Sequence, residues 1–328
     1  MMMSPTKTMS IDDVAGRTGC ILDEVEKAVI GKRDVLTRMM AAFLSSGGHI
    51  LLEDYPGLAK TLIANSFATA LGLDFKRIQF TPDLLPGDIT GGFILDTRQN
   101  QFVLRKGPLF TNILLADEIN RASPKTQSAL LEAMQEYQVS LEGESLKLPF
   151  PFIVIATQNP IEYEGTFPLP EAQLDRFMIR LSVGYPCNED EQQILARRAE
   201  RKEDAVALQA VVNPEEFLAM RAAVEDVFVN PDIQNYIVQV TAKTRKHRQI
   251  ELGASPRGSL ALLKLARAWA AIHNRDYVIP DDVKTFMLPV LGHRILLDPN
   301  LWNRKNAVNE VIDGIAASVP VPVTSPAK

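Results

Sequence analysis

The chain has 328 residues, 46% of them hydrophobic and 23% charged, which is typical of a globular protein of about two domains. Its net charge of −5 provides no general attraction to nucleic acid. The sequence lacks the long apolar run of a bilayer span, and its start lacks the apolar core of a secretion signal. Two cysteines in no zinc spacing suggest a reducing compartment, so we expect a cytoplasmic protein.

The pattern of apolar residues divides the chain into four parts. We expect disorder over residues 1–10, an α/β core over 11–186, a helical region over 187–318, and a disordered tail over 319–328. Within the core, apolar runs alternate with helical segments, which predicts a parallel, doubly wound sheet. The turn Gly184-Tyr185-Pro186 marks the end of that core.

A glycine-containing loop follows the first apolar run of the core. It occupies the frame G-x-x-x-x-G-K-[ST], with Asp54 and Ala59 in place of the two framework glycines. Gly57 supplies backbone freedom inside the loop, Lys60 is placed to reach β- and γ-phosphates, and the Thr61 hydroxyl is placed to bind Mg²⁺. A helix expected from Thr61 onward would direct its N-terminal amides at the same anion. The alternative is a Pro-Gly turn with a solvated lysine.

Two later apolar runs also end in polar residues. The run 113–116 leads into Asp117 and Glu118, which suit Mg²⁺ binding and activation of an attacking water. The run 152–157 leads into Asn159, whose amide is suited to orienting that water. Ligands gather at the carboxyl ends of strands in parallel sheets, so these residues are expected near the loop. The alternatives are solvated acids at a strand end and an asparagine that forms a turn before proline.

These segments together resemble the AAA+ ATPases and, within them, the MoxR family of the helix-2-insert clade. The resemblance is carried by residues 53–61, 107–110, 115–136, 156–160 and 164–177. It implies an α/β fold in which an AAA+ P-loop NTPase parallel-sheet core is followed by a small all-α lid domain. It also implies a helix-2 insert at about 88–106, with strands near 93–95 and 102–104, and a separate hairpin is expected around Gly143.

The resemblance implies ATP and Mg²⁺ as cofactors and assigns residues to them. Ile30 and Gly31 would lie against adenine. The phosphate loop and helix start would bind the rest of the nucleotide through Asp54, Tyr55, Pro56, Gly57, Leu58, Ala59, Lys60, Thr61 and Leu62. Thr61 and Asp117 would hold Mg²⁺. Glu118 would be the catalytic base, Asn159 sensor 1, and Arg257 sensor 2 at the start of a lid helix.

The resemblance also assigns Arg176 as an arginine finger that reaches into the neighbouring subunit's nucleotide. A guanidinium is planar, permanently charged and suited to phosphate oxygens. One alternative is a surface ion pair between Arg176 and Asp175. Another is that Arg180, four residues on, is the finger instead.

The function implied by the resemblance is an ATPase that works as an oligomeric ring, expected to be a hexamer. It would remodel, assemble or activate client proteins in a chaperone-like role, and the resemblance implies a von Willebrand factor A domain protein as a partner. The first alternative is a nucleic-acid-stimulated AAA+ motor or transcriptional regulator, favoured by Arg98, Arg105 and Lys106 in the insert. The second is a scaffold that binds ATP with negligible hydrolysis, suggested by the missing loop glycines.

Overall fold

The computed structural model describes residues 9–98, 100–160, 165–302, 304 and 306–322. Residues 1–8 and 323–328 of the expected disordered ends lie outside the described residues, as does Glu164 at the start of one recognised run. The described chain is ordered from its start, because Ser10 caps the first helix and forms a capping box with Asp13.

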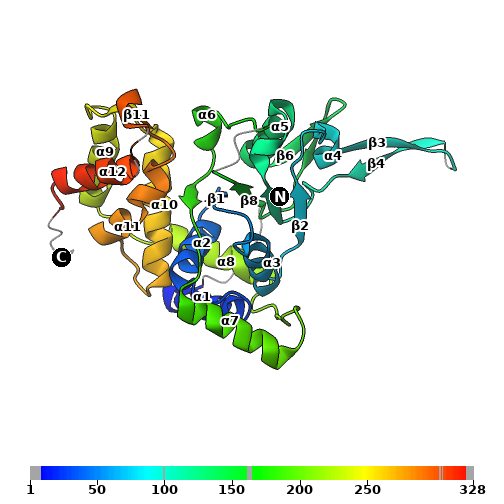
Figure 1. The fold of residues 1–328 in the computed structure, drawn as a ribbon, viewed down its shortest axis with the longest axis horizontal. Coiled ribbons are helices and arrows are strands. Elements are labelled where there is room, and N and C mark those ends of the chain that lie inside the picture. The colour runs from blue at the N-terminus through cyan, green and yellow to red at the C-terminus, as the bar shows by residue number, and fades with distance from the viewer. Residues whose placement is uncertain (1–8, 99, 161–164, 303, 305, 323–328) are drawn as a thin grey trace.

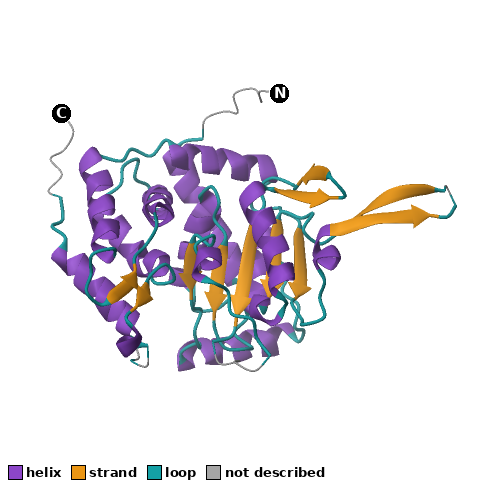
Figure 2. Cartoon of the chain, turned by 90° about the horizontal axis from the view of Figure 1, so that it is seen from above, coloured by secondary structure: helices purple, strands orange, loops and turns teal. Residues whose placement is uncertain are grey.

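A parallel sheet forms the centre of the molecule (Figure 2). Among the described residues it has five strands in the order β2-β5-β8-β1-β9, and every neighbouring pair is parallel. The strands are β1 (Ile50–Glu53), β2 (Phe75–Gln79), β5 (Ile113–Asp117), β8 (Ile153–Gln158) and β9 (Ile179–Leu181). The expected α/β fold with a parallel sheet is confirmed. No strand was predicted over Phe75–Gln79, because its lysine and arginine interrupt the apolar run.

Both faces of this sheet are buried, and the alternation of side chains along β5 shows why. Ile113 and Leu115 belong to one apolar cluster, and Leu114 and Ala116 to a second cluster on the opposite face. The first cluster includes α1 (Ile11–Glu26), α2 (Arg33–Leu44) and α3 (Lys60–Ala70), and it continues into the helices that follow the sheet. The second cluster includes α4 (Pro86–Thr90) and α5 (Pro124–Glu136). The carboxyl ends of the strands are therefore held rigidly from both sides.

Two hairpins extend from the core. In the first, β3 (Gly91–Asp96) pairs antiparallel with β4 (Gln101–Lys106), and the ribbon projects from the body of the molecule (Figure 1). In the second, β6 (Gln138–Leu141) pairs with β7 (Glu144–Lys147) across a turn that contains Gly143. Both hairpins were predicted from the sequence, and both are confirmed.

The remaining chain is mainly helical. Its helices are α7 (Asn188–Arg201), α8 (Pro214–Glu225), α9 (Pro231–Thr244), α10 (Pro256–Ile272), α11 (Pro280–Leu291) and α12 (Ala307–Ser318). The short elements of the chain are α6 (Glu171–Leu174), η1 (Ile119–Arg121), η2 (Pro299–Leu301), β10 (Ile250–Leu252) and β11 (Leu296–Leu297). Since β10 and β11 pair antiparallel, the lid region is helical apart from one short ribbon.

The lid region packs directly on the N-terminal helices. Helix α10 contacts both α1 and α2, and Figure 1 shows it between them and the outer lid helices. The segment between α7 and α8 also contacts the core, because the amides of Val211 and Val212 donate to the carbonyl of Ala70 at 2.8 and 3.3 Å. Across the described residues, no helix has both the length and the apolar character needed to cross a membrane.

Candidate functional site

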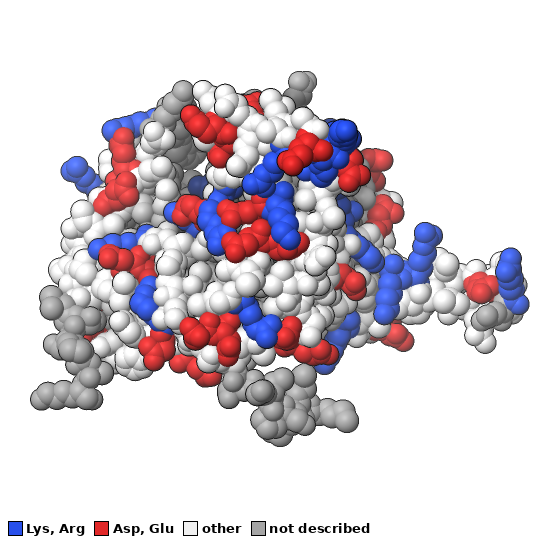
Figure 3. Space-filling view, turned by 90° about the horizontal axis from the view of Figure 1, so that it is seen from below, with Lys and Arg blue, Asp and Glu red and all other residues white. Residues whose placement is uncertain are grey.

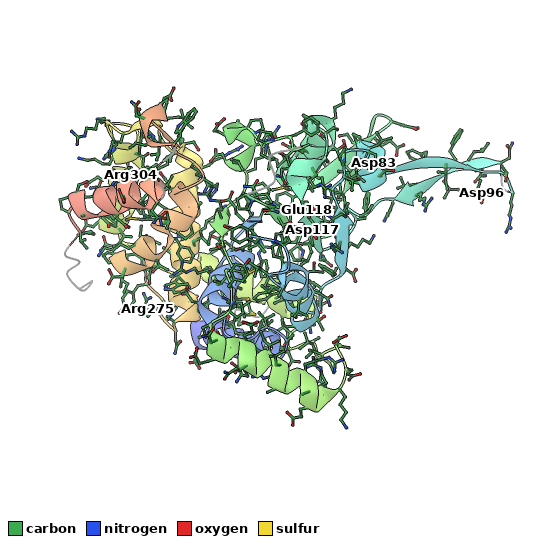
Figure 4. The ribbon with its side chains drawn as sticks, viewed as in Figure 1. Asp83, Asp96, Asp117, Glu118, Arg275 and Arg304 are labelled. Atoms are coloured by element: carbon green, nitrogen blue, oxygen red, sulfur yellow. The ribbon has the colours of Figure 1, made fainter. Side chains whose placement is uncertain are left out.

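A cleft of about 470 Å³ opens where β1, β5 and β8 end. Its lining combines the glycine-containing loop with the polar tips of the strands: Asp54, Pro56, Gly57, Leu58, Ala59, Lys60, Thr61, Leu62, Arg77, Gln79, Asp117, Glu118, Thr157, Gln158 and Asn159. Figure 4 shows Asp117 and Glu118 side by side near the middle of the molecule. The structure thus brings together in this strand-end cleft the strand-tip residues and, apart from Tyr55, the loop residues that the sequence singled out.

The loop before α3 has an open, left-handed backbone at two positions. Gly57 has a φ of +82° and nothing within 4 Å of the place where a Cβ would stand. Ala59 has a φ of 53°, a conformation that glycine adopts without strain, and it immediately precedes α3. The Lys60 ammonium donates to the carbonyls of Tyr55 (2.7 Å) and Asp54 (3.1 Å). It therefore lies across the loop, within reach of an anion seated on the helix N-terminus.

Asp54 explains the replacement of the first framework glycine. Its buried carboxylate accepts hydrogen bonds from the Ser182 hydroxyl (2.7 Å) and from the amides of Val183 (2.6 Å) and Gly184 (3.1 Å). These bonds attach the phosphate-loop frame to the segment after β9. Because the side chain is already used, Asp54 is available to a nucleotide only through its backbone.

Thr157 organises the two acids at the end of β5. Its hydroxyl donates to Oδ1 of Asp117 (2.6 Å) and accepts from the amide of Glu118 (2.9 Å). Oδ2 of Asp117 accepts from Arg77 at 2.7 Å. A carboxylate and the Thr61 hydroxyl are the oxygen ligands that suit Mg²⁺, which usually keeps several waters and phosphate oxygens as its other ligands. The residues present therefore fit a Mg-nucleotide.

Two hydrogen-bond donors restrict the rotation of the Glu118 side chain. Its Oε2 accepts from the Gln79 amide at 2.7 Å and from Arg121 at 3.0 Å, and its backbone is left-handed with a φ of 56°. The surrounding contacts hold Glu118 in this uncommon backbone conformation, and such conformations are frequent at functional sites. Both donors bond Oε2, so a water can be activated by Oε1 while these contacts hold the side chain in place.

Four residues that line the cleft were not predicted from the sequence: Arg77, Gln79, Thr157 and Gln158. Arg77 and Gln79 lie on β2, which pairs in parallel with β5 so that Gln79 stands opposite Asp117. The available signal for Thr157 was its place as the last residue of a buried apolar run. No pattern in the chain indicated that β2 would supply donors to both acids.

The residues expected against adenine lie outside the lining of the strand-end cleft. Ile30 is buried, and Gly31 has a φ of +73° with Asp190 so close that a Cβ would stand 1.9 Å from its carboxylate oxygen. The positive φ favours glycine there, and any larger residue would also require the Asp190 side chain to shift. Next to it, Lys32 donates to the carbonyl of Tyr185 at 2.7 Å, and the Tyr185 ring stacks on Tyr55 of the phosphate loop, with 6.0 Å between centroids.

A second cleft, of about 220 Å³, contains the two arginines expected to act on phosphate. Arg176 and Arg257 both line it, together with Lys264 and Arg294. Arg176 donates to the side chain of Gln135 at 3.1 Å. We call this the arginine cleft; none of its lining residues lines the strand-end cleft.

Two alternatives for Arg176 can now be compared with the geometry. Within the described residues, Asp175 pairs with Arg294 (2.8 Å) and lies 4.0 Å from Arg257, and it does not pair with Arg176. Arg180 bridges to Glu53 at 3.1 Å and donates to the carbonyl of Gly292 at 3.1 Å. Arg180 is thus committed to internal contacts between β1 and the lid, whereas Arg176 is directed into the arginine cleft.

Comparison with known proteins agrees with the observed fold. The family described as "ATPase family associated with various cellular activities (AAA)" matches residues 49–179, and the AAA lid domain matches residues 242–314. Chaperone MoxR1 of Mycobacterium tuberculosis is 42% identical over 308 residues, which cover 91% of this chain and 81% of that protein. The chain belongs to the MoxR family of AAA ATPases.

Other relatives cover almost the whole chain. YeaC of Bacillus subtilis, described as uncharacterized, is 46% identical over 95% of this chain and 97% of that protein. The crystal structure of a proposed ATPase from Cytophaga hutchinsonii has a TM-score of 0.88 and 39% identity, and it covers 95% of this chain and 97% of that one. The family and fold expected from the resemblance are therefore confirmed, and a chaperone stands among the MoxR relatives.

Proposed function

We propose that this MoxR-family chain hydrolyses ATP with Mg²⁺ and that two copies are needed to complete one site. In the strand-end cleft, Lys60 and the N-terminal amides of α3 bind the phosphates, while Thr61 and Asp117 hold Mg²⁺. Glu118 polarises the attacking water, and Asn159, which also lines the cleft, orients it against the γ-phosphate.

The observation that carries the proposal is the separation of the two clefts. One chain presents the acids and the phosphate loop in the strand-end cleft, and it presents Arg176 and Arg257 in the arginine cleft. The arginines of one chain therefore serve the nucleotide of its neighbour. Repeating this contact head to tail generates a closed ring, for which a hexamer is the family expectation.

Binding of the nucleotide must rearrange existing contacts. Lys60 would exchange the carbonyls of Tyr55 and Asp54 for phosphate oxygens, and Asp117 would exchange Arg77 for Mg²⁺. Gln79 and Arg121 both bond Oε2 of Glu118, so its Oε1 would face the water. Each exchange replaces an interaction within the protein by a charge-assisted one with the ligand, so the resting contacts keep the site ordered without blocking it.

The output proposed for this cycle is remodelling, assembly or activation of client proteins, with ATP hydrolysis driving it. The relative described as a chaperone supports this role. A partner with a von Willebrand factor A domain is part of the same proposal. We place the protein in the cytoplasm.

Steady-state ATP hydrolysis against protein concentration tests the proposal, with wild type and Arg176→Ala side by side. We expect specific activity to rise with concentration and to fall by about 10³-fold or more in the variant, with ATP binding retained. Flat specific activity and an unaffected variant would mean that the site is complete in one chain.

One observation favours a second function, a nucleic-acid-stimulated motor. The β3–β4 ribbon exposes Phe102 beside the basic side chains of Arg105 and Lys106. Figure 3 shows Lys and Arg along this ribbon, but on the rest of the face it draws, acidic and basic side chains are interspersed. Addition of single- or double-stranded DNA separates the two functions, because only the motor predicts stimulated hydrolysis.

A further inference from the structure

A buried arginine follows the last turn of α11 and forms hydrogen bonds with the segment that carries Arg176. Arg294 is only 7% exposed. Its Nε donates to the Asp175 carboxylate (2.8 Å), one terminal nitrogen donates to the carbonyl of Met178 (3.1 Å), and the other donates to the carbonyls of Phe177 (2.6 Å) and Asp175 (3.3 Å). These four bonds bracket Arg176 on both sides in the chain, while the Arg176 side chain itself lines the arginine cleft and donates to Gln135.

Further contacts attach the same turn to the lid. The hydroxyl of Ser255, the N-cap of α10, donates to the other carboxylate oxygen of Asp175 at 2.9 Å. His293 is buried and lies 3.0 Å from the Phe177 carbonyl. The turn 175–178 is thus bonded to the start of α10 and to the end of α11. Arg257, two residues after Ser255, enters the arginine cleft from that same helix start.

We propose that Arg294, with Asp175, is a positioning device that fixes Arg176 on the lid, so that the lid and the finger act on the neighbouring subunit as one rigid piece. This inference rests on the function proposed above and adds two residues to it. Arg294 touches no nucleotide. It acts through the backbone that carries Arg176.

The chemistry of the guanidinium makes this role specific to arginine. Its planar fork supplies five N–H donors, and Arg294 uses them on Asp175 and on carbonyls from two elements, including that of Val290 at 2.6 Å. A lysine keeps the charge that pairs with Asp175 but has one nitrogen, and so cannot reach carbonyls on both sides of Arg176. A misplacement of about 1 Å is enough to cost about 10²-fold in rate.

The test compares Arg294→Lys with a matched control, Arg275→Lys. Arg275 also forms a bidentate pair with an aspartate, Asp282, at 2.6 and 2.8 Å, within the lid and without a bond to the turn 175–178. Figure 4 labels Arg275 on the part of the lid remote from Asp117 and Glu118. We expect Arg294→Lys to lower kcat for ATP hydrolysis by about tenfold to a hundredfold, with KM for ATP changed less than about twofold. Arg275→Lys should leave both constants near those of wild type.

Mixing of subunits then separates positioning from simple damage. An Arg294→Lys subunit keeps its own strand-end cleft, and a Glu118→Gln subunit keeps its arginines. When the two variants are mixed, the Glu118→Gln subunit supplies an intact Arg176 to its neighbour, so activity should exceed the sum of the separate variants. Arg176→Ala mixed with Glu118→Gln is the reference for this recovery. Recovery with Arg176→Ala but not with Arg294→Lys would overturn the inference.

A measurement independent of turnover completes the test. Hydrogen exchange at the amides of Phe177 and Met178 should be faster in Arg294→Lys than in wild type or Arg275→Lys, because the turn has lost its clamp. If Arg176→Ala shows no recovery on mixing, the trans mechanism fails, and the clamp is decided by this exchange alone. Unchanged exchange in Arg294→Lys, and in Asp175→Asn as a second variant, would show that the turn is held by other contacts.

Discussion

The two clefts of this protein are built in different ways. The strand-end cleft takes its residues from the tips of parallel strands and the adjoining loop, so that neighbouring strand ends supply Asp117, Thr157 and Gln79. The arginine cleft is assembled from a turn of the core and from the start of a lid helix, joined by Arg294. The first cleft depends on the sheet alone, whereas the second depends on how the lid is attached. In the function proposed above, the chemical step and its control by assembly would therefore be carried by separate parts of the fold.

The largest effect should follow from a change in the strand-end cleft alone. Glu118→Gln removes the base while keeping a side chain of the same shape that can still meet Arg121 and Gln79. We expect ATP hydrolysis to fall by about 10²–10⁴-fold while ATP binding is retained. Turnover assays and equilibrium binding of a fluorescent ATP analogue measure the two quantities. Equal, near-zero turnover in wild type and variant would instead favour a nucleotide-binding scaffold.

A second prediction concerns the pH dependence of stability, which depends on a histidine in the wall of the arginine cleft. His49 is fully buried there, its Nδ1 accepts from the Val154 amide (3.0 Å), and its Nε2 lies 3.1 Å from the Met134 carbonyl. Burial lowers the pKa of His49 from 6.5 to about 4, the charge of Arg221 adds to the shift, and the Met134 carbonyl opposes it.

The sign of the resulting pH dependence follows from that shift. The unfolded chain binds a proton at His49 near pH 6.5, whereas the folded chain binds it only near pH 4, so stability is lost as the pH falls through this window. The loss should reach about 2 kcal/mol by about pH 5 and about 3 kcal/mol by about pH 4. Urea unfolding at several pH values measures it. His49→Gln keeps one acceptor and one donor and should flatten the profile; an equally steep profile in that variant would assign the dependence to other groups.

The sequence predicted the strand-end cleft well and the arginine cleft only in part, for a physical reason. Residues such as Lys60 and Asp117 sit next to the apolar runs that place them, so local pattern and position in the fold coincide. Arg294 shows no such local signal, because its partners on the turn 175–178 lie more than a hundred positions earlier in the chain and are mostly backbone carbonyls. Carbonyl acceptors are present at every residue, so no side-chain pattern identifies the ones that are used.

The same contrast applies to the fold. The strand β5 can be predicted from its apolar run because both of its faces are buried. In contrast, β2 lies at the edge of the sheet and carries Lys76 and Arg77. Its importance comes from pairing with β5, which aligns Gln79 with Asp117. Tertiary pairing therefore places the donors to Asp117 and Glu118 where local propensity does not indicate a strand.

A smaller effect is expected from Arg257→Ala, which asks whether both arginines of the second cleft act across the interface. Loss of one charge-assisted contact to phosphate should cost about 1.5–3 kcal/mol, or about tenfold to 150-fold in kcat/KM. Mixing this variant with Glu118→Gln should restore activity, because the Glu118→Gln subunit supplies an intact Arg257 to the Arg257→Ala subunit, which keeps Glu118. A variant that stays inactive on mixing would place Arg257 in the site of its own chain and would divide the arginine cleft between two functions.

The smallest effect should come from the backbone of the phosphate loop. Ala59 occupies a left-handed conformation that costs an alanine about 1 kcal/mol relative to glycine, so Ala59→Gly should raise the free energy of unfolding by about that amount. The matched control is Gly57→Ala, at a φ of +82°, which should lower the free energy of unfolding by about 1 kcal/mol. Urea unfolding of the two variants measures both changes. Opposite signs would show that the loop is held in its binding geometry before nucleotide arrives; equal values for both variants and wild type would mean that the loop relaxes freely, and that the strand-end cleft is as dependent on its partners as the arginine cleft.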